Sequence, residues 1–531
     1  MEAVAIVGTG PMGIYVFRAL CDQRKPLQIW LFEKGSKAGI GMPYSPETAS
    51  KTMLANIASI EIPSISDTYL DWLKAQPKAR LRSYGLDAMD LDDRQFTPRL
   101  LLGEYFRDQL MELIQTARSA GHMVEVREGT EVVDIRPTNA GLIVRTGDGD
   151  VEEVFDRVVL ATGHVFPDSE DGTLAYFPSP WSGLIDAEIP ATRVGIMGTS
   201  LSAIDAAMAV AGQHGRFRRD ASGEQLQFIT SSTDLKITLM SWTGVLPEAD
   251  FYCPLPYEDL VAMTHEAVAQ ALRDDQTYDA LFDLFREELE RADPTYAELI
   301  GLHELTADTF PDAYFKARAD SDPFQWARMN LDEVERNKSR QITVPWRYAI
   351  LRMHEVVELA VPSLGEADRT RFDKGLKTVF TDNYAAVPSE SIRRLLALRD
   401  AGVLGVLALG HDYQLERETA QTRIVANGQS HVFDVFIDAR GQKALTAQDL
   451  PFPTLREALE SEGVEVPEVD EGYTLIAPDG FAGRVKLGAI PYLMHDRPFI
   501  QGITACASIG EAIAQSIKTE IGARRRRRLA A

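Results

Sequence analysis

Two stretches of the chain share the same order of apolar and polar positions. In each stretch a short apolar run is followed by a small-residue turn and then by a segment whose apolar residues recur with helical spacing. The first run is residues 4–7 with its turn at 8–13, and the second is residues 194–197 with its turn at 198–203. This order predicts a buried strand, a tight turn and a helix, which together begin a dinucleotide-binding fold.

The first turn, Gly8-Thr9-Gly10-Pro11-Met12-Gly13, has the complete glycine pattern. Gly8 permits the tight turn, Gly10 lets the backbone approach a pyrophosphate, and Gly13 lets the helix pack closely on the sheet. The helix expected over residues 13–21 directs its amino end, with free N–H groups, toward the phosphates. We interpret this unit as dinucleotide-binding, with a purely structural glycine turn as the alternative.

An acidic residue follows the next predicted strand. That strand covers residues 27–32 and ends at Glu33, with Lys34 beside it. Because Glu33 comes about twenty residues after the first turn, its carboxylate is expected to bind the adenosine ribose hydroxyls. We assign both residues to the cofactor site.

The second turn, Gly198-Thr199-Ser200-Leu201-Ser202-Ala203, is a variant because Ser200 stands in place of the second glycine. A helix is expected over 202–211 and a strand over 237–241. The residues after that strand, 241–244, offer no basic side chain for a 2′-phosphate. Lys236 and the arginines at 216, 218 and 219 are alternatives, so the pattern does not decide between NADPH and NADH.

Two dinucleotide sites in one chain indicate an enzyme that passes a hydride from a nicotinamide to a bound flavin. The predicted fold class is α/β, with two Rossmann-like nucleotide-binding folds and a helical insertion. The expected parts are an FAD-binding domain (1–165), an NAD(P)H-binding domain (166–254), a helical insertion that caps the substrate (255–365), a return to the FAD-binding domain (366–523) and a basic tail (524–531).

Several local patterns support this layout. In the first part we expect a helix over 105–120, strands over 123–126, 130–135, 142–146 and 157–160, and a hairpin turn at 147–150. The insertion has helical spacing at 278–291 and 345–360, and strands return at 403–409, 423–425 and 433–441. An oligomerisation or scaffold role for the insertion remains an alternative.

The last helix is expected to run through residue 521, and its amino end would stabilise negative charge on a flavin. Gly502 and Ser508 are therefore assigned to the cofactor site. The basic run 524–528 is expected to be solvated and mobile.

Composition limits the remaining choices. The chain has 531 residues, 45% of them hydrophobic, which suggests two or three domains. A net charge of −24 argues against binding to nucleic acid or an anionic membrane. No apolar stretch is long enough to span a bilayer, and the first residues lead directly into a strand rather than a signal peptide. Three scattered cysteines fit a reducing cytoplasm.

The cysteines also decide between classes of flavoenzyme. Cys21, Cys253 and Cys506 form no CxxC or CxxxxC pair, which a disulfide reductase needs to receive electrons. No metal-ligand cluster is evident among the scattered histidines and cysteines. The chemistry is therefore expected to come from the cofactors.

Further segments carry a resemblance to a known family. They include the two turns and the following: Gly39-Ile40-Gly41-Met42-Pro43-Tyr44-Ser45, Met53-Leu54-Ala55-Asn56, Ala161-Thr162-Gly163-His164, Pro180-Trp181, Ala203-Ile204-Asp205, Asp322-Pro323-Phe324, Val387-Pro388, Leu396, Leu398 and Gly402. Together they resemble the FAD/NAD(P)-binding flavoprotein monooxygenases, a group with the bacterial FAD-dependent urate hydroxylase and the amino-acid N-hydroxylases that form nitrosuccinate from aspartate.

The resemblance implies FAD bound between Gly8 and Asn56, a reduced nicotinamide at the second turn, and activation of oxygen through a C4a-hydroperoxyflavin. It assigns Gly41, Met42, Asn56, Thr162 and Gly163 to the cofactor site. The implied reaction is N-hydroxylation of a small amino acid, with an aspartate-like substrate favoured. Oxygen and a small molecule are the expected partners, and the sequence leaves open whether the chain forms a homodimer.

Candidate catalytic and substrate residues follow from the same reading. Asn56 and Lys51 are expected to position groups near the flavin, with an exposed loop charge as the alternative for Lys51. An acidic substrate needs arginines that hold carboxylates bidentately, and Arg340, Arg347 and Arg352 are candidates, with surface salt bridges as the alternative. Tyr384 is a further substrate candidate and, like Ser200 and Trp242, departs from the family pattern.

Other functions remain open. A Baeyer–Villiger enzyme is disfavoured because the FxGxxxHxxxW signature is absent after Gly163, and a single-component aromatic hydroxylase would lack the second nucleotide fold. The alternatives are a flavin reductase that delivers electrons to a partner protein, a hydroxylase of a purine-like heterocycle, and a protein that uses FAD only structurally.

Overall fold

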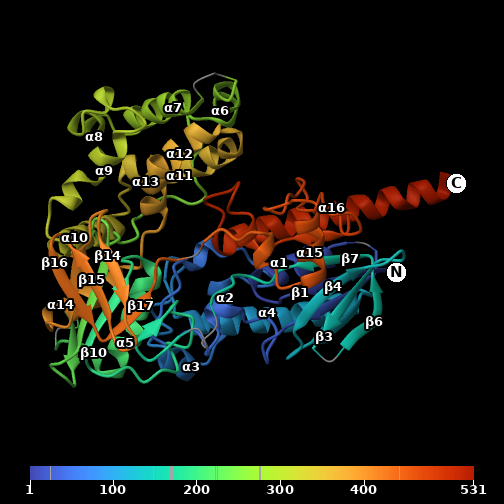
Figure 1. Ribbon diagram of the computed structural model, residues 1–531, viewed down its shortest axis with the longest axis horizontal. Helices are drawn as coiled ribbons and strands as arrows, with labels where there is room; N and C mark the ends of the chain where they lie inside the picture. Colours follow the sequence, from blue (N-terminus) through green and yellow to red (C-terminus); the bar gives the residue numbers. More distant parts are fainter. Residues whose placement is uncertain are drawn as a thin grey trace. The chain divides into compact units, whose positions relative to one another are not determined.

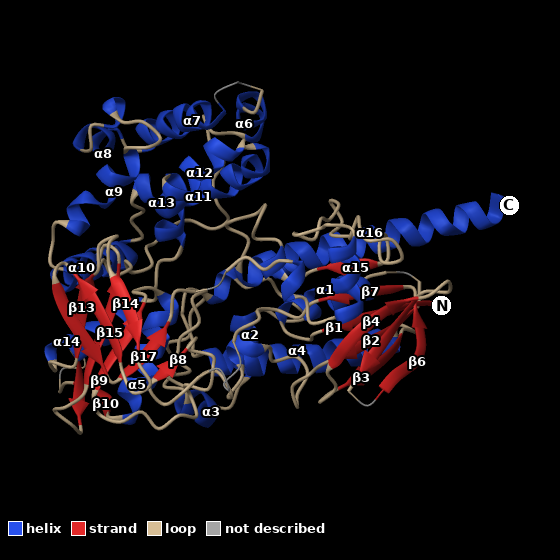
Figure 2. Ribbon diagram, viewed as in Figure 1, coloured by secondary structure: helices blue, strands red, loops and turns tan. Residues whose placement is uncertain are grey.

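The computed structural model describes residues 1–23, 25–147, 149–167, 172–221, 223, 225–273, 277–441 and 443–530, without the side chains of 150, 152 and 524–530. The chain divides into two compact units (Figures 1 and 2). Unit 1 comprises Met1–Val165, Gln442–His495 and Ile500–Ala531, and unit 2 comprises Phe166–Gly441 and Asp496–Phe499.

Unit 1 is built on a five-stranded parallel sheet of order β18-β7-β1-β2-β3. The central strand β1 is fully buried at Val4, Ala5 and Ile6, as expected for a strand inside a parallel sheet. The strands are β1 (Glu2–Val7), β2 (Leu27–Phe32), β3 (Met123–Arg127), β7 (Arg157–Leu160) and β18 (Val485–Leu487).

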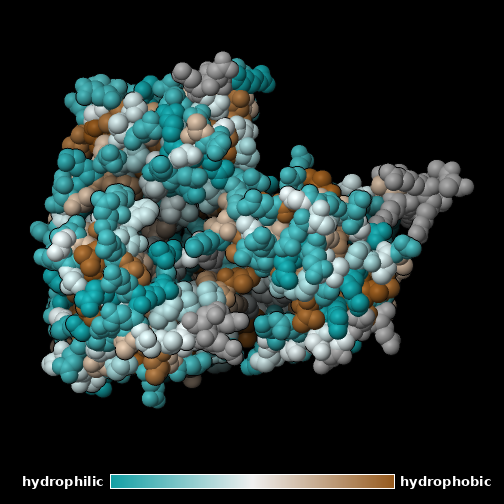
Figure 3. Space-filling view, in the orientation of Figure 1, coloured by the Kyte–Doolittle hydropathy of each residue, from teal (hydrophilic) through white to brown (hydrophobic). Residues whose placement is uncertain are grey.

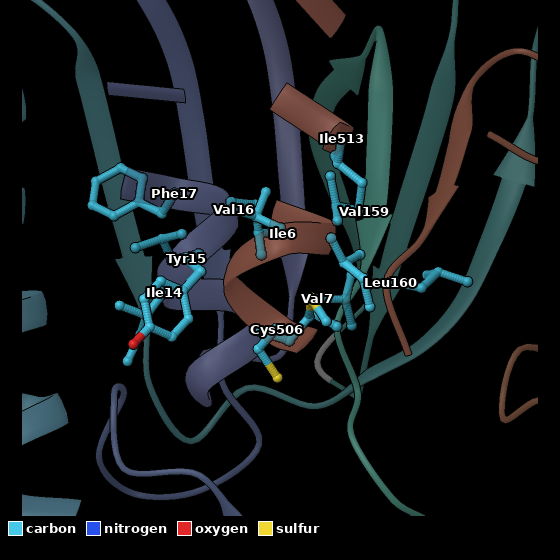
Figure 4. Packing of buried hydrophobic residues seen from close by; sticks show 14 of the residues in the cluster. Ile6, Val7, Ile14, Tyr15, Val16, Phe17, Val159, Leu160, Cys506 and Ile513 are labelled. Atoms are coloured by element: carbon cyan, nitrogen blue, oxygen red, sulfur yellow. The ribbon is translucent and has the colours of Figure 1, made fainter. Parts of the chain in front are cut away.

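Helix α1 (Pro11–Cys21) follows β1 and packs against the long C-terminal helix α16 (Gly502–Ala530), as Figure 4 shows. The two helices approach closely at Gly510, where a Cβ would lie 2.8 Å from the backbone of Tyr15. Between them and the sheet lies one apolar core that includes Ile6, Val159 and Ile513.

Other elements complete unit 1 around this sheet. The antiparallel sheet β4-β5-β6 forms the hairpin expected near residue 147, although Asp148 itself lies outside the described residues. The elements are α2 (Tyr69–Ala75), α3 (Lys78–Ser83), α4 (Arg99–Ser119), β4 (Val132–Pro137), β5 (Leu142–Thr146), β6 (Gly149–Phe155) and α15 (Pro453–Ser461).

Unit 2 contains a second five-stranded parallel sheet, of order β13-β12-β9-β17-β8. Helix α5 (Leu201–Gln213) follows β9, just as α1 follows β1. The strands are β8 (Tyr176–Phe177), β9 (Arg193–Met197), β12 (Lys236–Ser241), β13 (Leu404–Ala408) and β17 (Val435–Asp438). Two antiparallel sheets accompany them: β10 (Gly215–Arg219) with β11 (Leu226–Thr230), and β14 (Gln414–Arg417), β15 (Thr422–Ala426) and β16 (Gln429–Phe433).

The stretch between β12 and β13 is helical and has an apolar core of its own. Phe285, Phe310 and Phe380 lie in this core together with Phe499, which arrives from the far end of the chain. The helices are α6 (His265–Ala271), α7 (Thr277–Ala292), α8 (Pro294–Leu299), α9 (Phe310–Ala319), α10 (Pro323–Arg340), α11 (Pro345–Ala360), α12 (Glu366–Lys374), α13 (Leu376–Tyr384) and α14 (Ser389–Asp400).

The predicted fold class is confirmed, since each parallel sheet contains a central strand that is followed by a glycine turn and a helix. One part of the layout differs from expectation. Strands β13 and β17 pair with β12 and β9 in the sheet of unit 2, whereas we expected residues 366–523 to return to the FAD-binding fold. Only the part after residue 441 returns to unit 1, and Asp496–Phe499 within that part belong to unit 2. Local periodicity identifies a buried strand but not the sheet that it joins.

The face drawn in Figure 3 is largely hydrophilic, with hydrophobic residues in small groups. Among the helices of the described residues, none is both long and apolar enough to cross a membrane.

Candidate dinucleotide-binding sites

The first turn is a place where three backbone segments cross. Gly8 has φ +98°, and a Cβ there would lie 2.3 Å from the carbonyl oxygen of Ala161 at the end of β7. A Cβ at Gly13 would lie 2.1 Å from the carbonyl oxygen of Gly8. Only glycine fits these two positions, and the turn leaves the first N–H groups of α1 without intrahelical partners. The geometry is that of a cradle for a pyrophosphate.

A second loop lies directly against this turn. A Cβ at Gly10 would lie 3.2 Å from the Cα of Gly41, and Gly41 itself has φ +80° and approaches the ring of Pro11. The N–H of Gly39 donates to Thr9 Oγ1 at 3.0 Å. The structure therefore brings Gly41 and Met42 beside the first turn, as the resemblance implied.

Glu33 ties the end of β2 to the first turn. Its carboxylate accepts hydrogen bonds from Thr9 Oγ1 at 2.6 Å, from Thr9 N at 3.2 Å and from Gly35 N at 2.8 Å. These three bonds use most of the roughly four acceptor sites of the carboxylate, and the one that remains, on Oε1, can accept a ribose hydroxyl. Lys34 instead forms an exposed ion pair with Glu131 at 2.7 Å, which occupies its ammonium group.

The end of β7 and the loop before Asn56 also belong to unit 1. Gly163 has φ +71°, and the next residue, His164, is kept neutral because burial lowers its pKa to about 4. Asn56 is exposed and follows a segment held by the hydrogen bond from Ala55 N to Thr97 O. Lys51 lies elsewhere, with its Nζ 3.3 Å from Ser83 O and over the ring of Tyr84.

One segment of this site was missed by the sequence analysis. Gly488 follows β18, and a Cβ there would lie 3.1 Å from the sulfur of Met12. Its N–H donates to Leu160 O at 2.9 Å, so the end of β18 lies beside the ends of β7 and the first turn. The only local signal was a glycine directly after Val485-Lys486-Leu487, and the charged Lys486 in the middle hides this buried strand from a hydrophobic pattern.

The amino end of α16 begins at Gly502, which has φ +77°. Ser508 lies further along this helix, and its hydroxyl donates to Thr504 O of the same helix at 3.3 Å. Of the two residues assigned to the cofactor from this helix, Gly502 therefore lies at the amino end. The structure does not describe the side chains of the basic run 524–528.

The second turn repeats this architecture in unit 2. Gly198 has φ +128°, and a Cβ there would lie 2.7 Å from Ala439 O at the end of β17. Ser200 is the N-cap of α5 with φ −99°, a conformation open to any residue, so serine replaces glycine here without strain. Thr199 Oγ1 donates to Ser241 Oγ at 3.3 Å, which joins the turn to the end of β12. Leu201, Ser202 and Ala203 form the first turn of α5.

Two of the four basic residues considered for a 2′-phosphate, Lys236 and Arg219, are engaged elsewhere. Lys236 is the first residue of β12 and donates to Gly402 O at 2.7 Å. It lies about 16 Å along the strand from the carboxyl end, where dinucleotides bind. Arg219 forms an ion pair with Glu390 at 3.0 Å.

The four substrate-binding candidates have different surroundings. Arg347 is buried in an ion pair with Glu248, and burial lowers its pKa to about 10. Arg352 donates to the carbonyl oxygens of residues 258 and 259, both at 2.9 Å. Arg340 is exposed at the end of α10, and the ring of Tyr384 lies 5.3 Å from that of His354. Arg347 and Arg352 thus contact parts of the protein itself, through a buried ion pair and two backbone carbonyls rather than through the surface salt bridges named as the alternative.

A stability measurement distinguishes a structural role of Arg347 from a role in substrate binding. Arg347→Ala leaves Glu248 buried without its partner, so we expect a loss of about 3–5 kcal/mol in the free energy of unfolding. Arg340→Ala, at an exposed position, is expected to change it by less than about 0.5 kcal/mol. Urea unfolding followed by circular dichroism measures both, and an unchanged midpoint for Arg347→Ala would contradict the structural role.

The cysteine thiols are buried or partly buried and have low reactivity. Burial raises the pKa of Cys21 and of Cys506 to about 12, and Cys253 is also buried. At neutral pH the first two are therefore protonated and poor nucleophiles. Among the residues that the structure describes, no group of three or more histidine, cysteine, aspartate or glutamate side chains is arranged to hold a metal ion.

Comparison with known proteins places the chain in a family. It is 53% identical over 532 residues to the uncharacterized protein YdhS of Escherichia coli K12, covering 100% of this chain and 99% of the relative. The chain belongs to the YdhS family. Residues 264–384 match the YdhS-like middle domain, which corresponds to α6 through α13. Residues 5–165 match the family described as FAD-NAD(P)-binding, which confirms the predicted cofactor class for unit 1 of this YdhS-family protein.

Solved structures show the same fold at low identity. The ornithine hydroxylase PvdA of Pseudomonas aeruginosa is 13% identical with a TM-score of 0.51, and 98% of this chain and 99% of that chain align. The FAD-bound cadaverine monooxygenase DfoA of Erwinia amylovora is 12% identical with a TM-score of 0.51, over 97% and 94%. The ornithine N-hydroxylase of Kutzneria sp. 744 is 15% identical with a TM-score of 0.50, over 98% and 99%. At the level of the fold, the predicted resemblance to flavoprotein monooxygenases is confirmed.

Proposed function

We propose that this YdhS-family protein is an FAD-dependent, NAD(P)H-using monooxygenase that N-hydroxylates a small amino acid or amine. The observation that carries the proposal is the repeated arrangement of two parallel sheets. Each has a glycine turn after its central strand and a helix whose amino end follows the turn. One such site serves a bound flavin and the other a nicotinamide, which is what hydride delivery to a flavin requires.

Unit 1 fits FAD on its own geometry. The crossing at Gly8, Gly13 and Ala161 excludes side chains from the place that a pyrophosphate takes, and Glu33 offers an acceptor for the ribose. Bound FAD would supply hydride acceptance and oxygen activation. The chain itself would bind the cofactor and exclude water from the reacting atoms. Asn56 remains our candidate for positioning, whereas the contacts of Lys51 with Ser83 and Tyr84 support a role in the loop.

The overall reaction balances as a monooxygenation. One oxygen atom of O2 enters the N–H bond of the amine to give a hydroxylamine, and the other leaves as water. NAD(P)H supplies two electrons in the form of one hydride, and a proton comes from solvent. Little acid–base machinery is needed from the protein, because a neutral amine is itself the nucleophile.

The substrate class is inferred from the relatives with the same fold, which act on ornithine and cadaverine. An aspartate-like substrate remains in the proposal, although the contacts of Arg347 and Arg352 leave it without the arginine clamp that we expected. The free cysteines fit a reducing compartment, so we place the reaction in the cytoplasm.

A substrate-stimulation assay tests the proposal. The purified protein should be yellow, and its oxidation of NADH or NADPH should accelerate at least about tenfold with the right amine among aspartate, ornithine, lysine and cadaverine. Mass spectrometry should then show a product heavier by one oxygen atom, and 18O2 should label it. If oxidation needs a protein acceptor instead and no product gains oxygen, the electron-transfer alternative replaces this proposal.

A further inference from the structure

Two ring side chains stand together at the carboxyl ends of β12 and β13. Trp242 directly follows β12 and is 60% exposed, which is unusual for a tryptophan. His411 lies three residues after β13, and the two ring centroids are 5.3 Å apart with the planes tilted by 47°. Both residues belong to unit 2, beside the second turn.

The backbone around the two rings is rigidly built. The ladder between β12 and β13 continues past both strands, because Leu409 N donates to Ser241 O and Gly410 N donates to Trp242 O. The side chain of Asn427 adds a hydrogen bond to Ala408 O at 2.9 Å from the turn between β15 and β16. These hydrogen bonds fix the backbone at Trp242, so its side chain is exposed at a well-defined position rather than on a loosely held loop.

The topology explains what such an exposed ring would meet. In this parallel sheet β12 and β13 lie on one side of β9, and β17 and β8 lie on the other. The connections on the two sides of β9 therefore run in opposite directions across the sheet, which makes the end of β9 a topological switch point. A dinucleotide binds at the carboxyl ends around this switch, with its pyrophosphate at the turn after β9 and its adenosine over the next strand. That next strand is β12, and Thr199 Oγ1 joins its end to the turn. The adenosine therefore falls on Trp242 and His411.

The charged residues near Trp242 and His411 indicate which dinucleotide would bind there. Residues 241–244 and 408–413 contain no lysine or arginine, and Asp412 adds a negative charge beside His411. Arg440 follows β17, two strands from β12 and so about 10 Å away across the sheet, and its guanidinium is paired with Asp438 at 2.6 Å. A 2′-phosphate at β12 would therefore find repulsion rather than a clamp.

We infer that Trp242 and His411 form the platform for the adenosine of the nicotinamide dinucleotide, and that this platform selects NADH over NADPH. The inference rests on the proposed function and deepens it by naming the electron donor. In NADPH-dependent sites a basic side chain binds the 2′-phosphate of the adenosine. Here the adenine would instead stack on the indole ring of Trp242. Specificity then arises from the missing clamp and from Asp412.

Equilibrium binding tests the inference without any turnover. The FAD-loaded protein is titrated with NAD+ and with NADP+, which cannot donate a hydride, by isothermal calorimetry at pH 8. We expect NAD+ to bind about tenfold or more tightly than NADP+. Trp242→Ala should weaken NAD+ binding about 10- to 100-fold, the range for loss of one aromatic stack on a base. Trp242→Arg should reverse the ranking of the two dinucleotides.

Controls separate this inference from the proposed function. Leu299→Ala and His303→Ala remove exposed side chains from the helical part of the same unit and should leave both dissociation constants unchanged. If neither dinucleotide binds the wild-type protein, the second cofactor site and the proposed function fail together. If both bind but NADP+ binds more tightly, or Trp242→Ala binds NAD+ like wild type, the platform alone is refuted.

Discussion

Gly8→Ala protein is expected to be colourless. The added Cβ would lie 2.3 Å from Ala161 O, and alanine would also have to adopt φ +98°. Backbone strain and forced separation of packed segments each cost about 1–3 kcal/mol, and every 1.4 kcal/mol is about a tenfold change in binding. The ratio of flavin absorbance near 450 nm to protein absorbance should therefore fall at least tenfold after purification.

Two other glycines give matched controls for Gly8→Ala. Gly129 also has positive φ, at +62°, but a Cβ there meets nothing within 4 Å, so Gly129→Ala carries the strain without the clash. Gly212, near the end of α5, has neither feature. We expect both variants to retain their flavin.

A milder variant at the same turn distinguishes loss of FAD from loss of folding. Gly10 has φ −67°, and its added Cβ would lie 3.2 Å from the Cα of Gly41, which needs a shift of only a few tenths of an ångström. Gly10→Ala should keep the circular dichroism spectrum of wild type and bind FAD more weakly. Full flavin content in both Gly8→Ala and Gly10→Ala would show that FAD binds elsewhere.

The parts of the fold that could be predicted from the sequence are those set by neighbouring residues. The strand, turn, helix and second strand from β1 to Glu33 lie within one βαβ unit, so each signal reinforces the next. The positions of β13 and β17 could not be predicted in this way. Their pairing partners, β12 and β9, lie more than 160 and 230 residues earlier, and parallel pairing leaves no local pattern that specifies the sheet.

The site was predictable to the same extent. The glycines of the first turn can be recognised locally, because the positive φ at Gly8 and the close approaches at Gly8, Gly10 and Gly13 require glycine at a fixed spacing. The arginines carry no such mark. Arg347 pairs with Glu248, which lies 99 residues earlier and across a helical stretch, and the sequence does not show whether an arginine meets a substrate or the protein's own carboxylate. The ring pair of Trp242 and His411 was hidden for the same reason.

The second large effect is expected where α16 is fixed to the sheet of unit 1. Glu520 on this helix binds the ammonium group of Lys486 at 2.6 Å and the guanidinium of Arg157 at 2.7 Å, and both cations are completely buried. Lys486 also donates to Thr474 Oγ1 at 2.6 Å and to Ser516 Oγ at 2.8 Å. The network joins the amino end of β7 and the middle of β18 to α16, about 27 Å along the helix from Gly502.

Glu520→Leu leaves the buried ammonium group of Lys486 without its carboxylate, whereas Arg157 keeps its ion pair with Glu2, and we expect the free energy of unfolding to fall by about 3–5 kcal/mol. Lys486→Met combined with Glu520→Leu removes a cation together with the anion, and it should recover at least about 1 kcal/mol of that loss. Glu511→Leu, which removes an exposed carboxylate 3.6 Å from Arg18, should change stability by less than about 1 kcal/mol. Urea unfolding of the full chain, followed by circular dichroism, measures these three variants and Lys486→Met alone, and additive effects of the two single substitutions in the double variant would contradict the coupling.

The same network gives stability a defined dependence on pH. Burial alone would raise the pKa of Glu520, but the hydrogen bond from Lys486 and the charge of Arg157 outweigh it, so this pKa lies below its usual value near 4.5. The folded state therefore holds fewer protons at this site than the unfolded state between the two pKa values. Its contribution is complete above about pH 5 and is lost as the pH falls through the lowered pKa. Wild type should lose more stability than Glu520→Leu between pH 5 and pH 3, and parallel curves for the two proteins would show that the carboxylate is not held in this way.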